Sequence, residues 1–90
     1  MIIESMDVLL KILVNKEGSD LHLKSGSPPV VRVNGELTKI KTEGMTPHSI
    51  NKLIGQILSD KQQKEFSEKK VLDFGYGLPE VARFRINCSM

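Results

Sequence analysis

The sequence has 90 residues, of which 39% are hydrophobic and 27% are charged, with a formal net charge of +2. A chain of this length and balance can form one small folded domain and is not a disordered segment. The weak charge excludes a surface that neutralises many phosphates, and with no Trp, one Tyr and three Phe there is no stacking platform for bases. We therefore expect no nucleic acid among its partners.

Three further features favour a cytoplasmic location. The single cysteine, Cys88, cannot form an internal disulfide, which fits a reducing compartment. The apolar stretch Val8–Val14 is interrupted by Lys11 and is far shorter than the roughly 20 residues of a membrane-spanning helix. It also lacks the basic flank and the small-residue cleavage site of a signal peptide.

The first predicted element is a helix near the start of the chain, where polar residues recur at steps of three and four and mark one solvated stripe. The other faces are apolar over residues 3–14. We expect one side of this helix to pack on its own sheet and the other to be offered to a partner. Gly18 is expected to end the helix in a left-handed cap.

Three strands are predicted next. Residues 20–24 alternate between polar and apolar side chains, with Leu21 and Leu23 on one face. Residues 30–33 and 36–40 flank Asn34-Gly35, a pair that favours a type I′ hairpin because both positions tolerate positive φ.

Two helices and two strands complete the predicted order. Thr46-Pro47 predicts a helix start, with a buried face that recurs as far as Leu58. Ser59 with Gln62 predicts a capping box and a second helix to about residue 69. Strands at 71–76 and 81–88 follow, with a turn at 77–79. The order αβββααββ predicts a single α+β domain over residues 1–90 with an antiparallel sheet. Because Ser89-Met90 directly follows a strand, we expect a longer parent protein.

Most motifs of enzyme chemistry are missing from the sequence. No G-x-x-x-x-G-K-[ST] pattern is present, so no P-loop can form. Gly75-Tyr76-Gly77 begins a G-x-G pattern, but Glu80 stands where the third glycine would be, and we interpret these glycines as turn residues. His22, His48 and Cys88 lack the spacing of metal ligands.

Ser19, Asp20 and His22 invite comparison with a hydrolytic triad, since Asp20 and His22 share a strand face. A triad is assembled from separate elements beside an oxyanion hole, and the sequence indicates neither. We interpret this carboxylate as a residue that fixes a loop or orients the histidine.

The arginines are the most informative candidates for a site. Only Arg32, Arg83 and Arg85 are present, and all fall in predicted strands. Arg83 and Arg85 share one strand face, about 7 Å apart, while Phe84 and Ile86 face the core. Such a pair can clamp phosphate or carboxylate oxygens, or it can simply be the solvated side of an amphipathic edge strand. We predict an exposed, unpaired Arg83 and Arg85; pairing with a local carboxylate such as Asp73 or Glu80 would favour a structural role.

The sequence resembles the opening of PilT-type retraction ATPases of type IV pili, in order and over nearly all of the chain. The segments that carry the resemblance are SDLHL at 19–23, GSPP at 26–29, Arg32, GEL at 35–37, DKQ at 60–62, Phe66, DF at 73–74 and PEVARFRIN at 79–87. Related secretion and extension ATPases share a looser form of the histidine-containing strand, usually behind an extra domain. Cys88-Ser89-Met90 departs from the family pattern.

The resemblance implies a PAS-like N-terminal domain, followed in the parent by a RecA-like domain that carries the Walker motifs and binds ATP and Mg. It implies a homohexamer in which each N-terminal domain packs on the RecA-like ATPase domain of a neighbouring subunit, with the pilus base machinery at the inner membrane as a further partner. Arg83, Arg85 and Arg32 would then approach the nucleotide phosphates. Residues 1–90 themselves would hold no cofactor or metal and would have no activity alone. The alternative is an independent PAS-like sensor or interaction domain.

Overall fold

The computed structural model describes residues 3–90, which form the predicted element order αβββααββ. The elements are α1 (Met6–Asn15), β1 (Asp20–Lys24), β2 (Val30–Val33), β3 (Glu36–Lys39), α2 (Pro47–Ile54), α3 (Asp60–Lys69), β4 (Val71–Leu78) and β5 (Ala82–Ser89). Predicted and observed boundaries agree closely at most elements. The exceptions are α2, which ends at Ile54 instead of continuing to Leu58, and β4, which continues to Leu78 through part of the predicted turn at 77–79.

The strands form one sheet in the order β3-β2-β1-β5-β4. The prediction of a fully antiparallel sheet is wrong at one junction, because the central strands β1 and β5 are parallel, with Asp20 opposite Arg85. From β3 at one edge of the sheet, the chain runs through α2 and α3 to the opposite edge, where β4 forms. The β4–β5 hairpin then brings β5 back to the centre, running in the direction of β1.

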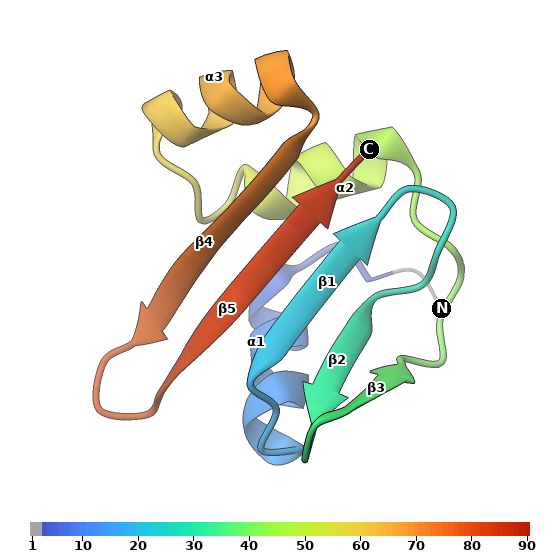
Figure 1. The fold of residues 1–90 in the computed structure, drawn as a ribbon, viewed down its shortest axis with the longest axis vertical. Coiled ribbons are helices and arrows are strands. Elements are labelled where there is room, and N and C mark those ends of the chain that lie inside the picture. The colour runs from blue at the N-terminus through green and yellow to red at the C-terminus, as the bar shows by residue number, and fades with distance from the viewer. Residues whose placement is uncertain (1–2) are drawn as a thin grey trace.

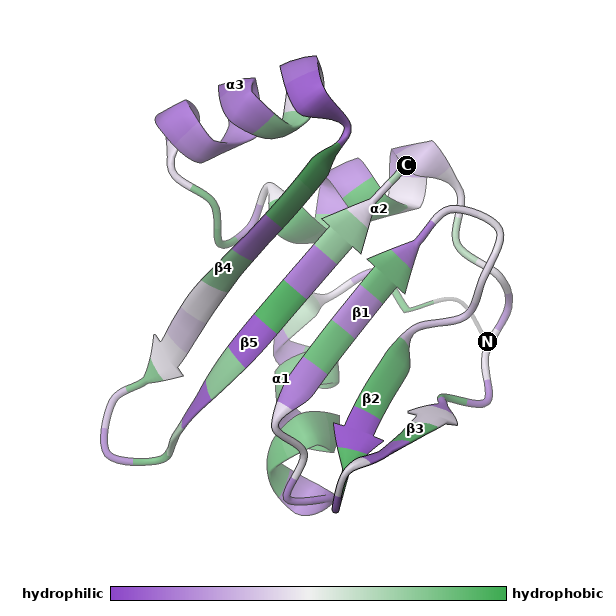
Figure 2. Cartoon of the chain, in the orientation of Figure 1, coloured by the Kyte–Doolittle hydropathy of each residue, from purple (hydrophilic) through white to green (hydrophobic). Residues whose placement is uncertain are grey.

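The helices cover only one face of this sheet. Figure 1 shows α1 and α2 behind the strands and α3 beyond the start of β4, with no element in front. The strand sequences match this arrangement, because β1 and β5 alternate between hydrophilic and hydrophobic bands in Figure 2 and their apolar residues are buried. The open face of the sheet therefore carries the polar side chains.

The core between helices and sheet uses most of the apolar surface of α1. Leu9 and Leu13 are fully buried and Leu10 is 3% exposed, whereas Val8 is 42% exposed. The apolar surface that α1 was expected to offer to a partner is therefore limited to Val8 and its surroundings. Phe66 is the buried residue of α3 and attaches this otherwise polar helix.

Turn and cap chemistry explains most of the boundaries. Asn34 and Gly35 have φ of 51° and 80°, as the type I′ hairpin requires. Ser59 closes the predicted capping box with Gln62. Thr46 caps α2 as predicted, and it also forms a capping box with Ser49 that was not predicted from the sequence.

Two predictions about glycines are wrong. The left-handed residue after α1 is Glu17, with φ of 56°, and not Gly18. Gly18 is needed for space, since a Cβ there would lie 2.9 Å from Leu13 Cδ2. Gly75 and Gly77 lie within β4 and not in a turn. Because these two glycines have no side chains, they leave room for the guanidinium of Arg83.

Candidate functional site: the open face of the sheet

All three arginines lie on the open face, as the alternation of β2 and β5 predicts. Arg83 and Arg85 are exposed, while Phe84 is 3% and Ile86 0% exposed. A slip of one residue would exchange these two sets of side chains, so the burial of Phe84 and Ile86 fixes the direction of the arginines.

Arg85 forms an ion pair with Asp73 of the neighbouring strand. Its Nε and Nη2 donate hydrogen bonds of 3.1 and 2.5 Å to the two carboxylate oxygens. This bidentate contact lowers the pKa of the Asp73 carboxyl below its ordinary value and raises the pKa of Arg85. The prediction of two unpaired arginines is therefore wrong for Arg85, and a structural role for this residue is favoured.

Arg83 has a different environment. Its guanidinium lies across β4, where a Cβ built on Gly75 or Gly77 would be 3.4 Å from Nη2 or 3.3 Å from Nη1. The absence of side chains at these two positions lets the arginine rest on the strand. Within residues 3–90 it forms no ion pair, so its charge is available to a ligand.

Arg32 is separated from the other two. Its Nη1 donates a 2.9 Å hydrogen bond to the carbonyl of Gly35 in the adjacent hairpin. Asp20 lies between Arg32 on β2 and Arg85 on β5 in the strand register. The backbones of Arg32 and Arg85 therefore lie two strand spacings apart, about 10 Å, with the Asp20 carboxylate on the strand between them.

Ser19, Asp20 and His22 do not form a catalytic relay. Ser19 Oγ donates a 2.6 Å hydrogen bond to Asp20 Oδ1, and His22 takes no part in it. The Nε2 atom of His22 is inaccessible to solvent and has no hydrogen-bond partner within the described part of the chain. No feature of the sequence indicates this orphaned nitrogen, because it depends on packing across three strands.

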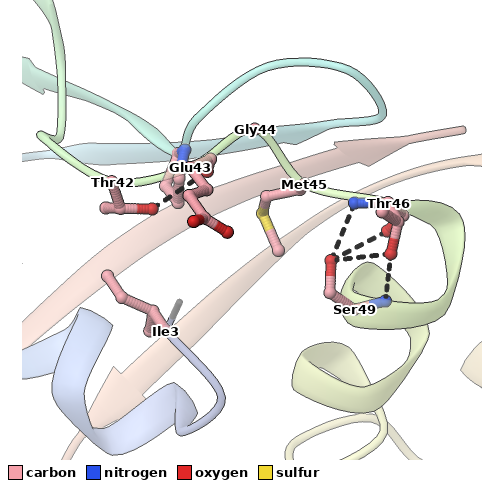
Figure 3. A pocket seen from close by; sticks show the side chains of 8 residues that line it. Ile3, Thr42, Glu43, Gly44, Met45, Thr46 and Ser49 are labelled. Atoms are coloured by element: carbon pink, nitrogen blue, oxygen red, sulfur yellow. Dashed lines mark hydrogen bonds between the residues drawn. The ribbon is translucent and has the colours of Figure 1, made fainter. Parts of the chain in front are cut away.

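The hollows of the surface are small or open. One partly enclosed hollow, of about 110 Å³, lies between the start of α1 and the loop before α2 (Figure 3). Ile3, Met45 and Ser49 line it together with residues 42–44. Ligand pockets usually measure about 300–1,000 Å³, so this one is too small for the ligand of a sensor domain.

Neither a metal site nor a membrane span is found in the described residues. Residues 3–90 contain no group of three or more His, Cys, Asp or Glu side chains placed to hold a metal ion. None of the three helices is long and apolar enough to cross a bilayer.

Comparison with known proteins identifies relatives of this chain. No family model matches the sequence. The chain is 40% identical over 84 residues to the type IV pilus retraction ATPase PilT of Pseudomonas aeruginosa, covering 91% of the chain. It is 28% identical over 79 residues to the type IV pilus ATPase PilU of the same organism, covering 88% of this chain and 21% of PilU.

Solved structures agree with the sequence relatives. The pilus retraction motor PilT with bound ADP matches with a TM-score of 0.67 and 34% identity, over 88% of this chain and 23% of that chain. The ATPase DotB of Legionella pneumophila matches with a TM-score of 0.69 and 26% identity, over 91% of this chain and 23% of that chain.

The mixed sheet, covered by helices on one face, and the sequence matches together define an α+β domain of the kind found in type IV pilus ATPases. The chain belongs among the PilT-type ATPases, as an N-terminal domain. It spans 24% of the length of the Pseudomonas PilT, about a quarter of that relative.

Proposed function

We propose that this chain serves as the nucleotide-capping and assembly domain of a motor ATPase that powers type IV pilus retraction. The observation that carries the proposal is its 40% identity to PilT over 91% of the chain. In the proposed assembly residues 1–90 form one PAS-like unit. A RecA-like domain of the same parent binds ATP and Mg, and six copies form a ring in the cytoplasm at the base of the pilus.

Within this proposal Arg83 is the leading candidate for the phosphate contact. Its guanidinium is exposed, has no carboxylate partner within residues 3–90 and rests on a glycine-lined strand. A cation delivered from a second domain stabilises the charge of the transferring phosphoryl group only when the cleft closes. Arg85 is held by Asp73, and Arg32 lies on a strand that is not adjacent to β5 and donates to the carbonyl of Gly35, so both are weaker candidates for this contact.

The independent sensor domain remains the second candidate. It needs an enclosed pocket, and the small hollow beside Met45 gives it little support.

A chimaera tests the capping role directly. This chain would replace the homologous segment of Pseudomonas PilT, and ATP turnover of the assembled ring would be measured. We expect the chimaera to hydrolyse ATP and Arg83→Ala to lower kcat by about tenfold to a thousandfold with a smaller change in KM, as for other charge-stabilising contacts. Lys24→Ala, which removes a positive charge elsewhere on the open face, is the matched control. Equal turnover in both variants would remove Arg83 from the proposal.

The isolated chain gives a second test. It should release no phosphate from ATP above the buffer background, because a P-loop is absent from residues 1–90. Hydrolysis that disappears in Arg83→Ala would show a catalytic site within the chain and would contradict the capping role.

A further inference from the structure

The outer edge of β4 carries unused backbone hydrogen-bonding groups. β4 is an edge strand of the sheet, and Figure 1 shows no element beside its free side. The N–H of Arg85 donates to the carbonyl of Ser19 at 3.0 Å, so the backbone groups of Arg85 point toward β1. Successive residues of a strand direct their backbone N–H and C=O groups to opposite sides. Phe84 and Ile86 therefore direct these groups toward β4.

This alternation fixes which groups of β4 are free. Tyr76 and Phe74 lie opposite Phe84 and Ile86 and use their N–H and C=O groups within the hairpin. The intervening residues Asp73, Gly75 and Gly77 direct theirs outward, and no partner for them is found within residues 3–90. Such a row of groups is a template for another strand.

The side chains of this edge are suited to close approach. The open face of β4 has no side chain at Gly75 or Gly77, and the Arg83 guanidinium lies over these two positions. On the helix-covered face, Phe74, Tyr76 and Leu78 are only partly buried. A strand added at this edge would cover that apolar surface.

We propose that the β4 edge pairs with the β4 edge of a second copy of this chain, antiparallel and about a two-fold axis at Gly75. In this register the outward groups of Asp73 face those of the partner's Gly77, and Gly75 faces the partner's Gly75. Facing residues of antiparallel strands share a face, so Phe74 packs beside the partner's Tyr76 and Leu72 beside the partner's Leu78. A slip of two residues either way would place Leu78 opposite Lys70 or Leu72 opposite Glu80.

Charge complementarity favours a second copy as the occupant. Asp73 would lie opposite the partner's Gly77, on which the partner's Arg83 rests, so the unpaired guanidinium would gain a carboxylate. The turn residue Glu80 would come beside the partner's Lys70, which precedes β4. Each of these contacts occurs twice by symmetry. The proposal does not depend on the motor function.

The self-association can be measured by sedimentation of the whole chain over a concentration series. A strand-edge interface falls below the size class of about 1,200 Å², so we expect a dimer with a dissociation constant of roughly 10 µM to 1 mM. Gly75→Pro removes the central outward N–H without touching the hairpin ladder and should weaken the dimer at least about tenfold. Gly75→Ala keeps that N–H and should dimerise as the parent chain does. A chain that stays monomeric throughout, or equal constants for the two variants, would overturn the proposal.

A charge exchange tests the register without a proline. Lys70→Glu and Glu80→Lys each create like-charged contacts in their own dimers and should weaken self-association about fivefold. Neither residue has an ion-pair partner within residues 3–90, so the monomer fold should be unaffected. An equimolar mixture of the two variants pairs opposite charges at both contacts and should associate as tightly as the parent chain. No recovery in the mixture would refute the two-fold register.

Discussion

Replacing Gly18 by alanine should destabilise the fold, whereas the same replacement at Gly75 should stabilise it. A Cβ on Gly18 would lie 2.9 Å from Leu13 Cδ2 and 3.2 Å from the carbonyl oxygen of Arg32. Leu13 is fully buried and cannot retreat. Overpacking costs about 1–3 kcal/mol, and the reduced freedom of the unfolded chain returns about 0.4–1 kcal/mol, which leaves a loss near 1–2 kcal/mol. At Gly75 the nearest atom is Arg83 Nη2 at 3.4 Å, the exposed end of a flexible side chain, so a gain of about 0.4–1 kcal/mol remains.

Urea unfolding followed by circular dichroism separates the two variants. With a slope of about 1 kcal/mol per molar urea for a small domain, the midpoint should fall by about 1–2 M in Gly18→Ala and rise by about 0.4–1 M in Gly75→Ala. The measurement is made at low protein concentration, so that self-association does not contribute. Shifts of the same sign would show that contact distance does not decide the outcome. A stabilised Gly18→Ala would show that Leu13 can repack.

Three further outcomes are expected. Because the Arg85 contact lowers the pKa of the Asp73 carboxyl, the stabilisation from this contact is present above the ordinary carboxyl pKa and is lost as the pH falls through the folded-state pKa. Asp73→Asn should therefore flatten the fall of the unfolding free energy at acid pH, and an unchanged pH dependence in this variant would contradict the contribution of the pair. Burial raises the pKa of Cys88 to about 11, so the native thiol should resist alkylation and react only as the chain unfolds; rapid labelling of the folded protein would contradict this burial. Phe66→Ala should cost about 3–5 kcal/mol and expose the amides of α3 to hydrogen exchange, and unchanged protection there would show that other contacts hold this helix.

Local chemistry was sufficient to predict the elements. The Asn34-Gly35 pair and the caps at Thr46 and Ser59 act within a few residues, so their effects can be read without knowing the fold. Period-two alternation was likewise sufficient to orient Arg83 and Arg85. These features depend on neighbours in the sequence, which explains their accuracy.

The errors arose where distant segments meet. Gly18 follows α1 as a cap would, but its role is set by Leu13 and by the backbone of Arg32 on another strand. Gly75 and Gly77 suggested a turn because the arginine that lies over them comes later in the chain. The partnership of Arg85 with Asp73 depends on the register of the β4–β5 hairpin, in which Leu78 faces Ala82, and the sequence leaves that register open.

The parallel pairing of β1 with β5 also has a consequence for how the chain folds. Its contacts join Asp20 to Arg85, so a long loop must close before the centre of the sheet exists. The hairpins on either side of this junction can form earlier. Until β5 pairs with β1, however, the side chains of Leu21 and Leu23 lack their neighbours on β5. We expect folding to be slow for a protein of this size and to occur in one cooperative step. During synthesis β5 is made after the other four strands of this sheet and joins its two halves, so until β5 emerges the nascent chain presents an apolar surface to chaperones.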